Sequence, residues 1–105
     1  MLQIETQSNW NAPKCFCDSC DREINEAKSA AVVFANFTQN GTRSTPLYVH
    51  KDFVHGDCLS QAESKVKKSG ASPGWEELST FLAHAIANVG MKAEDIRKTL
   101  DRPDT

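Results

Sequence analysis

The sequence predicts a small α+β protein built around two pairs of residues that commonly bind metals. Each pair, Cys17 with Cys20 and His55 with Cys58, is separated by two intervening residues. Between the pairs, two runs rich in β-forming residues flank an Asn-Gly dipeptide, which is the strongest short-range signal for a β-hairpin. After the second pair, apolar residues recur with the 3.6-residue period of amphipathic helices. These observations predict a knuckle, a β-hairpin and a helix, followed by a C-terminal αα-hairpin.

Length and composition indicate one small domain with an appended helical segment. The chain has 105 residues, of which 39% are hydrophobic and 25% charged, and its net charge is −2 with neutral histidines. We expect residues 1–70 to form the metal-binding module and residues 71–105 to form a helical hairpin packed on it or on a partner. A bound metal would help a domain of this size, because its hydrophobic core is small.

Neither secretion nor membrane insertion is expected. The first residues lack a basic segment followed by an apolar run, so they do not resemble a signal peptide. No apolar stretch approaches the roughly 20 residues of a membrane-spanning helix. We therefore expect a cytoplasmic protein, in which cysteines bind metals or stay reduced more often than they form disulfides.

The first two thirds of the chain contain signals for strands and one helix. Residues 1–6 alternate weakly and predict a short edge strand, whereas residues 8–14 are mostly polar and predict a turn. Residues 31–38 and 47–50 predict the two strands of the hairpin. Residues 57–68 carry a helical apolar stripe with lysines at the end, which favours a helix that stops there.

The last third is expected to be helical. Ser72 suits an N-cap and Pro73 the first helical position, so a helix is predicted from there to residue 88. Gly90 breaks the pattern, and residues 92–101 predict a second, shorter helix. Together these segments predict the αα-hairpin.

The two residue pairs predict one structural zinc ion. A two-residue spacer lets both side chains of a pair reach the same metal, and a Cys3His set is a common closed structural site. Cys15 and His50 are rival ligands on spacing alone. A lone histidine at a strand end is more often an ordinary surface or hydrogen-bonded residue, so the predicted ligand set is Cys17, Cys20, His55 and Cys58.

The order of knuckle, hairpin and helix resembles a treble-clef zinc finger, and the His-x-x-Cys pair is similar to that in the first half of a LIM domain. The resemblance covers residues 17–68. It implies that Cys17 and Cys20 come from the knuckle, and that His55 and Cys58 come from the loop entering the helix and its first turn. The 34 residues between the pairs exceed the gap in LIM domains, which predicts an extended or decorated hairpin.

Catalysis is not expected. Four protein ligands leave no open coordination position for water. A nuclease of the His-Asn-His type would need His50 and His55 as catalytic groups, and that set is incomplete if His55 binds zinc. A redox role for Cys17 and Cys20 would need a hydrophobic strand before the motif, but Asn-Ala-Pro-Lys lies upstream.

The predicted function is therefore protein binding, as an adaptor, inhibitor or regulator. Candidate partner-binding residues are the basic end of the first helix and two aromatic residues at helical spacing: Lys65, Lys67, Lys68, Trp75 and Phe81. The alternative is a nucleic-acid-binding transcriptional regulator, because residues 83–100 distantly resemble a helix-turn-helix. Residues 71–105 hold four basic and six acidic side chains, a net charge of 4 − 6 = −2, which favours the protein partner.

Overall fold

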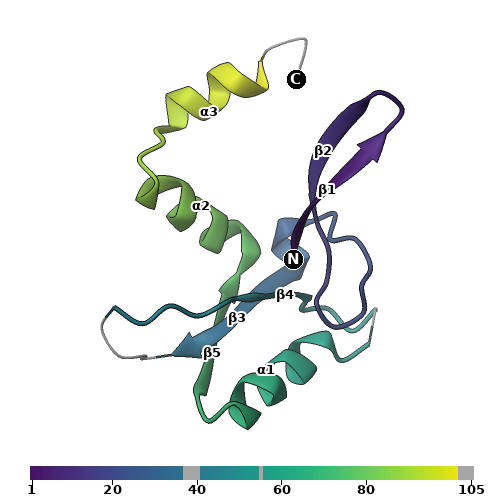
Figure 1. Cartoon of the computed structure of the whole chain (residues 1–105), viewed down its shortest axis with the longest axis vertical. Coiled ribbons are helices and arrows are strands. Elements are labelled where there is room, and N and C mark those ends of the chain that lie inside the picture. Colours follow the sequence, from purple (N-terminus) through teal and green to yellow (C-terminus); the bar gives the residue numbers. More distant parts are fainter. Residues whose placement is uncertain (37–40, 55, 102–105) are drawn as a thin grey trace.

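The computed structural model describes residues 1–36, 41–54 and 56–101. In these ranges the chain forms two antiparallel sheets, a short 3-10 helix and three α-helices, which confirms a mixed α/β fold (Figure 1). The elements in order are β1 (Leu2–Gln7), β2 (Trp10–Cys15), η1 (Ala27–Ser29), β3 (Ala30–Asn36), β4 (Leu47–His50), α1 (Cys58–Lys68), β5 (Ser72–Glu77), α2 (Leu78–Asn88) and α3 (Ala93–Leu100). None of the helices in the described ranges is long and apolar enough to cross a membrane.

The first sheet is a hairpin of β1 and β2, with Gln7 paired to Trp10 across a two-residue turn. The turn predicted over residues 8–14 is therefore wrong, because most of that segment is the strand β2. The sequence of this segment does not indicate a strand, since Asn and Pro are depleted in strands. Pro13 is tolerated because a two-stranded sheet has only edge strands, where a missing N–H donor need not disrupt the pairing.

The second sheet has the order β4-β3-β5, and all its neighbours are antiparallel. The predicted pairing of β3 with β4 is confirmed, with Ala30 opposite His50 and Val33 opposite Leu47. Asn40 of the expected turn lies outside the described residues. The residues Ala30–Val33 of the central strand are fully buried, so β3 forms the middle of the core.

The third strand of this sheet, β5, replaces the first turns of a predicted helix. Residues 72–77 pair along β3, with Trp75 opposite Val33 and Gly74 opposite Phe34, and the helix α2 begins only at Leu78. Pro73 and Gly74 have the lowest helix propensities, while the free edge of β3 offers a full set of backbone hydrogen bonds. Hydrogen bonding of residues 72–77 to β3 therefore outweighs the helix-start signal of Ser72 and Pro73.

Helices α1 and α2 complete the core, whereas α3 does not contribute to it. Ala62 of α1 and Leu78 of α2 are buried against the sheet. None of the eight residues of α3, all of which the structure describes, is buried, and Figure 1 shows α3 at the end of the molecule far from α1. The two predicted C-terminal helices are present, but a packed C-terminal αα-hairpin is not confirmed.

A substitution at Gly74 distinguishes the strand from the predicted helix. A Cβ atom at Gly74 would lie 3.0 Å from Cε2 of Phe34 and 3.1 Å from Cγ of Asn36. We expect Gly74→Val to lower the free energy of unfolding by about 1–2 kcal/mol through overpacking, measured by urea denaturation. The control Ser72→Val, at an exposed position of the same strand, should change it by less than about 0.5 kcal/mol. In a helix, replacing glycine would instead stabilise the protein.

Candidate metal centre

Three sulfur atoms and one imidazole converge at a buried point beneath the sheet. The ligating atoms of Cys17, Cys20, His50 and Cys58 all lie within 4.8 Å of one another, so the group could hold a metal ion. In a tetrahedral site, metal–sulfur bonds of about 2.3 Å and metal–nitrogen bonds of about 2.0–2.1 Å place sulfur and nitrogen roughly 3.6 Å apart. Sγ of Cys20 lies 3.5 Å from Nδ1 of His50. This separation is close to the one that a tetrahedral metal site requires between these two ligands.

The knuckle that follows β2 supplies two of the thiols. Backbone N–H groups of Ser19 and Cys20 both donate to Sγ of Cys17 at 3.4 Å. Asp21 closes the turn by donating its N–H to the carbonyl of Cys17, at 2.9 Å, and it takes a left-handed φ of +64°. Such a turn points amide dipoles at the sulfur atom, which favours its thiolate form.

Hydrogen bonds tie the knuckle to β4 and to α1. The N–H of Asp18 donates to the carbonyl of Tyr48 at 2.6 Å, and the N–H of Tyr48 donates to the Asp18 carboxylate at 2.7 Å. The hydroxyl of Ser19 donates to the carbonyl of Cys58 at 3.0 Å. The knuckle therefore occupies the outer edge of β4, and this contact brings the end of the strand, with His50, to the cysteines.

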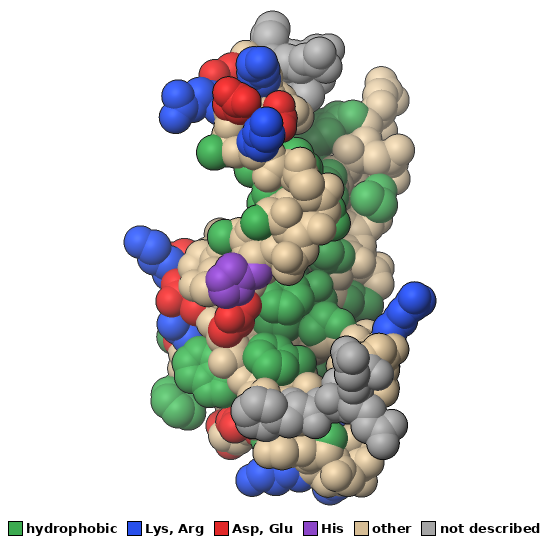
Figure 2. Space-filling model, turned by 90° about the vertical axis from the view of Figure 1, so that its left-hand side faces the viewer, with side chains coloured by type: hydrophobic (Ala, Val, Ile, Leu, Met, Phe, Trp, Pro, Cys, Tyr) green, Lys and Arg blue, Asp and Glu red, His purple; other side chains and the backbone are tan. Residues whose placement is uncertain are grey.

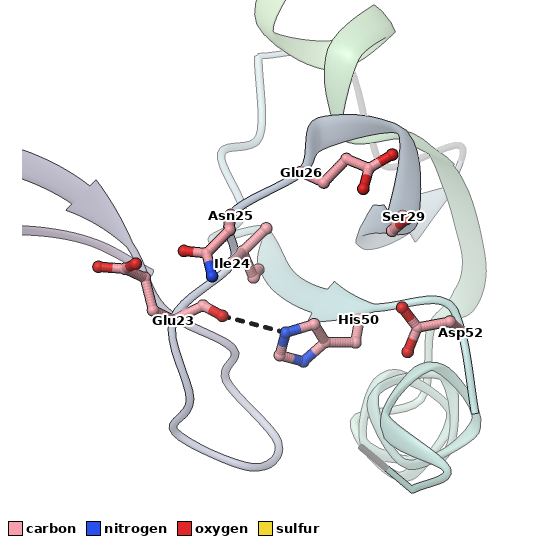
Figure 3. A pocket seen from close by; sticks show the side chains of 7 residues that line it. All are labelled: Glu23, Ile24, Asn25, Glu26, Ser29, His50 and Asp52. Atoms are coloured by element: carbon pink, nitrogen blue, oxygen red, sulfur yellow. Dashed lines mark hydrogen bonds between the residues drawn. The ribbon is translucent and has the colours of Figure 1, made fainter. Parts of the chain in front are cut away.

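His50 is oriented for metal binding by a backbone carbonyl. Its side chain is only 4% exposed, and Nε2 lies 3.2 Å from the carbonyl oxygen of Glu23 (Figure 3). A carbonyl can only accept a hydrogen bond, so Nε2 carries the proton and Nδ1 keeps its lone pair. Nδ1 is the nitrogen that faces Cys20. An outer partner of this kind is typical of histidine ligands.

The surroundings of the cluster act in opposite directions on the thiols of Cys58 and Cys17. Burial and the neighbouring sulfur atoms of Cys17 and Cys20 raise the pKa of Cys58 to about 12. Burial would also raise the pKa of Cys17, yet the amide N–H groups of Cys20, His50 and Ser19 lower it overall. Cys58 is the first residue of α1, where helix amides favour negative charge. A cation among the sulfur atoms would balance the negative charge of the thiolates that these amide groups favour.

The cluster contains the three predicted cysteines and a histidine that the sequence does not predict. Spacing favours His55, which lies outside the described residues, whereas the imidazole in the cluster belongs to His50. The prediction of His55 as a ligand is therefore untested, whereas His50, which the predicted set leaves out, lies within the cluster. His50 reaches the cysteines because the knuckle binds the edge of β4, and no local pattern encodes that contact. Cys15, a described residue, is not part of the cluster, and burial raises its pKa.

The five residues proposed on sequence grounds to bind a partner lie on three different elements. Lys65, Lys67 and Lys68 are exposed in the last turn of α1, at the opposite end of that helix from Cys58. Trp75 is about half exposed on β5. Phe81 of α2 is half-buried, and its ring meets Tyr48 edge-on with 6.0 Å between the centroids. Phe81 therefore takes part in packing.

A small acidic pocket lies beside His50 (Figure 3). Its volume is about 180 Å³, and the side chains that line it are those of Glu23, Ile24, Asn25, Glu26, Ser29, His50 and Asp52. A second pocket, of about 240 Å³, lies at Met1, Gln3, Phe16 and Asp21. Both volumes fall below the range of roughly 300–1,000 Å³ that is usual for small-molecule sites.

Comparisons with known proteins identify no relative of this chain. No protein-family model matches the chain, and no curated protein or solved structure matches it. The arrangement of the cluster is therefore the main guide to function.

Proposed function

We propose that the protein binds one zinc ion through Cys17, Cys20, His50 and Cys58, and that this ion has a structural role. The convergence of these four ligating atoms is the observation that carries the proposal. Thiolate and imidazole ligands in a tetrahedral arrangement suit zinc better than magnesium or calcium, which take oxygen ligands. Four protein ligands complete the coordination, so the ion has no open position for water or substrate.

The ion would join three parts of the chain that are distant in sequence. The knuckle, the end of β4 and the first turn of α1 each supply ligands. Among the residues that the structure describes, the largest fully buried side chains are valines and cysteines: Val32, Val33, Val49, Cys17 and Cys58. A core of this size contributes limited hydrophobic stabilisation. The free energy of zinc binding would therefore act as folding free energy.

The order of elements supports a treble-clef-like module. The knuckle is followed by the β3–β4 hairpin and then by α1, whose first residue is Cys58. The histidine ligand in this proposal comes from the end of the second hairpin strand rather than from the loop before the helix. In this respect the module departs from the His-x-x-Cys pair that suggests a LIM domain.

We further propose that the zinc-held module acts by binding another protein, as a cytoplasmic adaptor, inhibitor or regulator without catalytic activity. Four protein ligands would close the coordination shell, and both pockets described above are smaller than usual small-molecule sites. The net charge of −2 gives no general attraction to nucleic acid. The β1–β2 hairpin exposes Leu2 and Ile4 on one face and Trp10 on the other. An apolar surface of this kind on an isolated two-stranded sheet is a typical binding feature.

Substitution of each histidine tests the ligand set. We expect His50→Ala to weaken zinc binding by more than about 100-fold, since even outer-shell partners are worth 10–100-fold, and to unfold the region from the knuckle to α1. Native mass spectrometry with circular dichroism measures both effects. The matched control His55→Ala should keep one zinc ion per chain. Retention of zinc by His50→Ala and its loss in His55→Ala would reverse the assignment.

Zinc affinity should depend on pH with a definite sign. Without metal, the raised pKa of about 12 keeps the Cys58 thiol protonated throughout the neutral range. Zinc must displace this proton, so this thiol alone should lower the apparent affinity about tenfold for each unit that the pH falls. Competition with a chelator at several pH values, corrected for the protonation of the chelator, measures the slope. An affinity independent of pH would contradict thiolate ligation by Cys58.

Two substitutions on one strand test protein binding through the hairpin. Ile4 and Gln3 are neighbours on β1 that point to opposite faces, and both are exposed. Proteins captured from an extract of the source cells should be retained by Gln3→Lys and lost, by about tenfold or more, with Ile4→Lys, because the charge would be buried in the contact. Equal capture by both variants would exclude this face. Tight, steeply salt-dependent binding of mixed duplex DNA would instead support the nucleic-acid alternative.

A further inference from the structure

The backbone groups of β1 alternate between those that bind β2 and those that point away from it. The N–H of Phe16 donates to the carbonyl of Met1 at 2.8 Å, just beyond the first pair of the ladder. In an antiparallel ladder, hydrogen-bonded pairs of residues alternate with pairs that are not hydrogen-bonded. Every second residue of β1 therefore directs its N–H and C=O groups away from β2, and these residues are Leu2, Ile4 and Thr6.

The outer edge of β2 is closed to another strand. The N–H of Ile24 donates to the carbonyl of Cys15 at 2.8 Å, so part of this edge is already bonded. Pro13 has no N–H to donate, and it is followed by Lys14. Proline and lysine are the residues with which natural proteins protect the edges of sheets. These features oppose pairing of β2 with a further strand.

The outer edge of β1, in contrast, is open. Among the residues that the structure describes, none forms a backbone hydrogen bond to the outward groups of β1. The strand includes neither proline nor lysine, and Figure 1 shows it on the side of the hairpin away from α3. A two-stranded hairpin is marginally stable alone, and an unprotected edge is a template for another strand.

Charge offers no comparable basis for association. The face of the molecule in Figure 2 carries charged side chains of both signs, including those at the end formed by α3. The first turn of α3 is acidic and its last turn is basic. Mixed charges of this kind select neither a strongly acidic nor a strongly basic partner. Backbone hydrogen bonding at β1 is therefore the more specific signal.

We propose that the protein forms a two-fold symmetric homodimer in which β1 pairs antiparallel with β1 of a second copy. One register uses every outward group: Ile4 lies opposite Ile4 at the two-fold axis, and Leu2 lies opposite Thr6. This register forms about six interchain hydrogen bonds, two from each of three pairs. The sheet then has the order β2-β1-β1-β2. Because both of its ends are the closed edge of β2, association stops at two copies.

The side chains agree with the same register. Leu2, Ile4 and Thr6 of both copies lie on one face, where apolar and β-branched residues meet across the strands. On the other face, Gln3 of each copy lies opposite Glu5 of the other, so that an amide can donate to a carboxylate. A shift by two residues in one direction would set Glu5 against Glu5, which is destabilising. A shift by two in the other direction would leave Thr6 without a pair on β1.

Proline on either edge of the hairpin tests this dimer. Thr6 and Asn11 are opposite each other in the ladder, and their side chains share a hydrogen bond of 2.6 Å. Thr6→Pro and Asn11→Pro therefore remove the same side-chain bond and one outward N–H each, but on opposite edges. Sedimentation of the zinc-bound full chain at about 100 μM, where even weak interfaces are populated, should give a dimer for the wild type and for Asn11→Pro. Thr6→Pro should raise the dissociation constant about tenfold, because symmetry repeats the lost bond.

A change of side-chain charge gives a second test that leaves the backbone intact. Gln3→Glu sets a carboxylate against Glu5 at two symmetric positions and should weaken the dimer about fivefold. Gln3→Lys sets an ammonium group against Glu5 and should strengthen the dimer by a similar factor. The control Gln61→Glu makes the same change in net charge as Gln3→Glu at an exposed position of α1. It should leave the dissociation constant unchanged.

Hydrogen exchange locates the contact. The amide protons of Ile4 and Thr6 should exchange more slowly as the protein concentration rises, because only the second copy protects them. Native mass spectrometry should show one zinc ion per chain in every variant, which separates a failure of the dimer from a failure of the metal site. A monomeric wild type, a dimer in which these two amides gain no protection, or equal weakening by Thr6→Pro and Asn11→Pro would overturn the proposal.

Discussion

The concentration of three thiols and one imidazole at a buried point is the constraint on which the rest of the structure depends. These groups come from a turn, a strand end and a helix start, and hydrogen bonds between side chains and the backbone hold these three segments together. Without a cation, burial and the neighbouring sulfur atoms of Cys17 and Cys20 oppose the ionisation of Cys58. With a cation the same groups form a tight cross-link between elements that share few large apolar side chains. Such a cross-link would therefore compensate for the small hydrophobic core.

The central strand β3 connects the ligand cluster to the rest of the molecule. It pairs with β4, which carries His50, and with β5, which leads directly into α2. Its Ala and Val side chains are fully buried although none of them is large. The C-terminal helices are thus joined to the metal centre through one sheet.

Two segments extend beyond this framework. The β1–β2 hairpin and α3 both expose apolar side chains, and Figure 1 shows them diverging from the central sheet. Isolated hairpins and single short helices are both marginally stable on their own. Each segment therefore presents its own exposed apolar side chains outside the central sheet.

Sequence alone determined the features that depend on local chemistry. The spacing of Cys17 and Cys20, the position of Cys58 before an amphipathic helix and the β-prone runs around Asn-Gly suffice to predict a metal-binding knuckle, the β3–β4 pairing and α1. Two features were decided only by tertiary structure. Residues 72–77 became a strand because the free edge of β3 offered hydrogen bonds that a proline- and glycine-containing helix start could not match. His50 became the fourth member of the cluster because the knuckle binds the edge of β4 at Tyr48, a contact between residues 30 positions apart that no local pattern encodes.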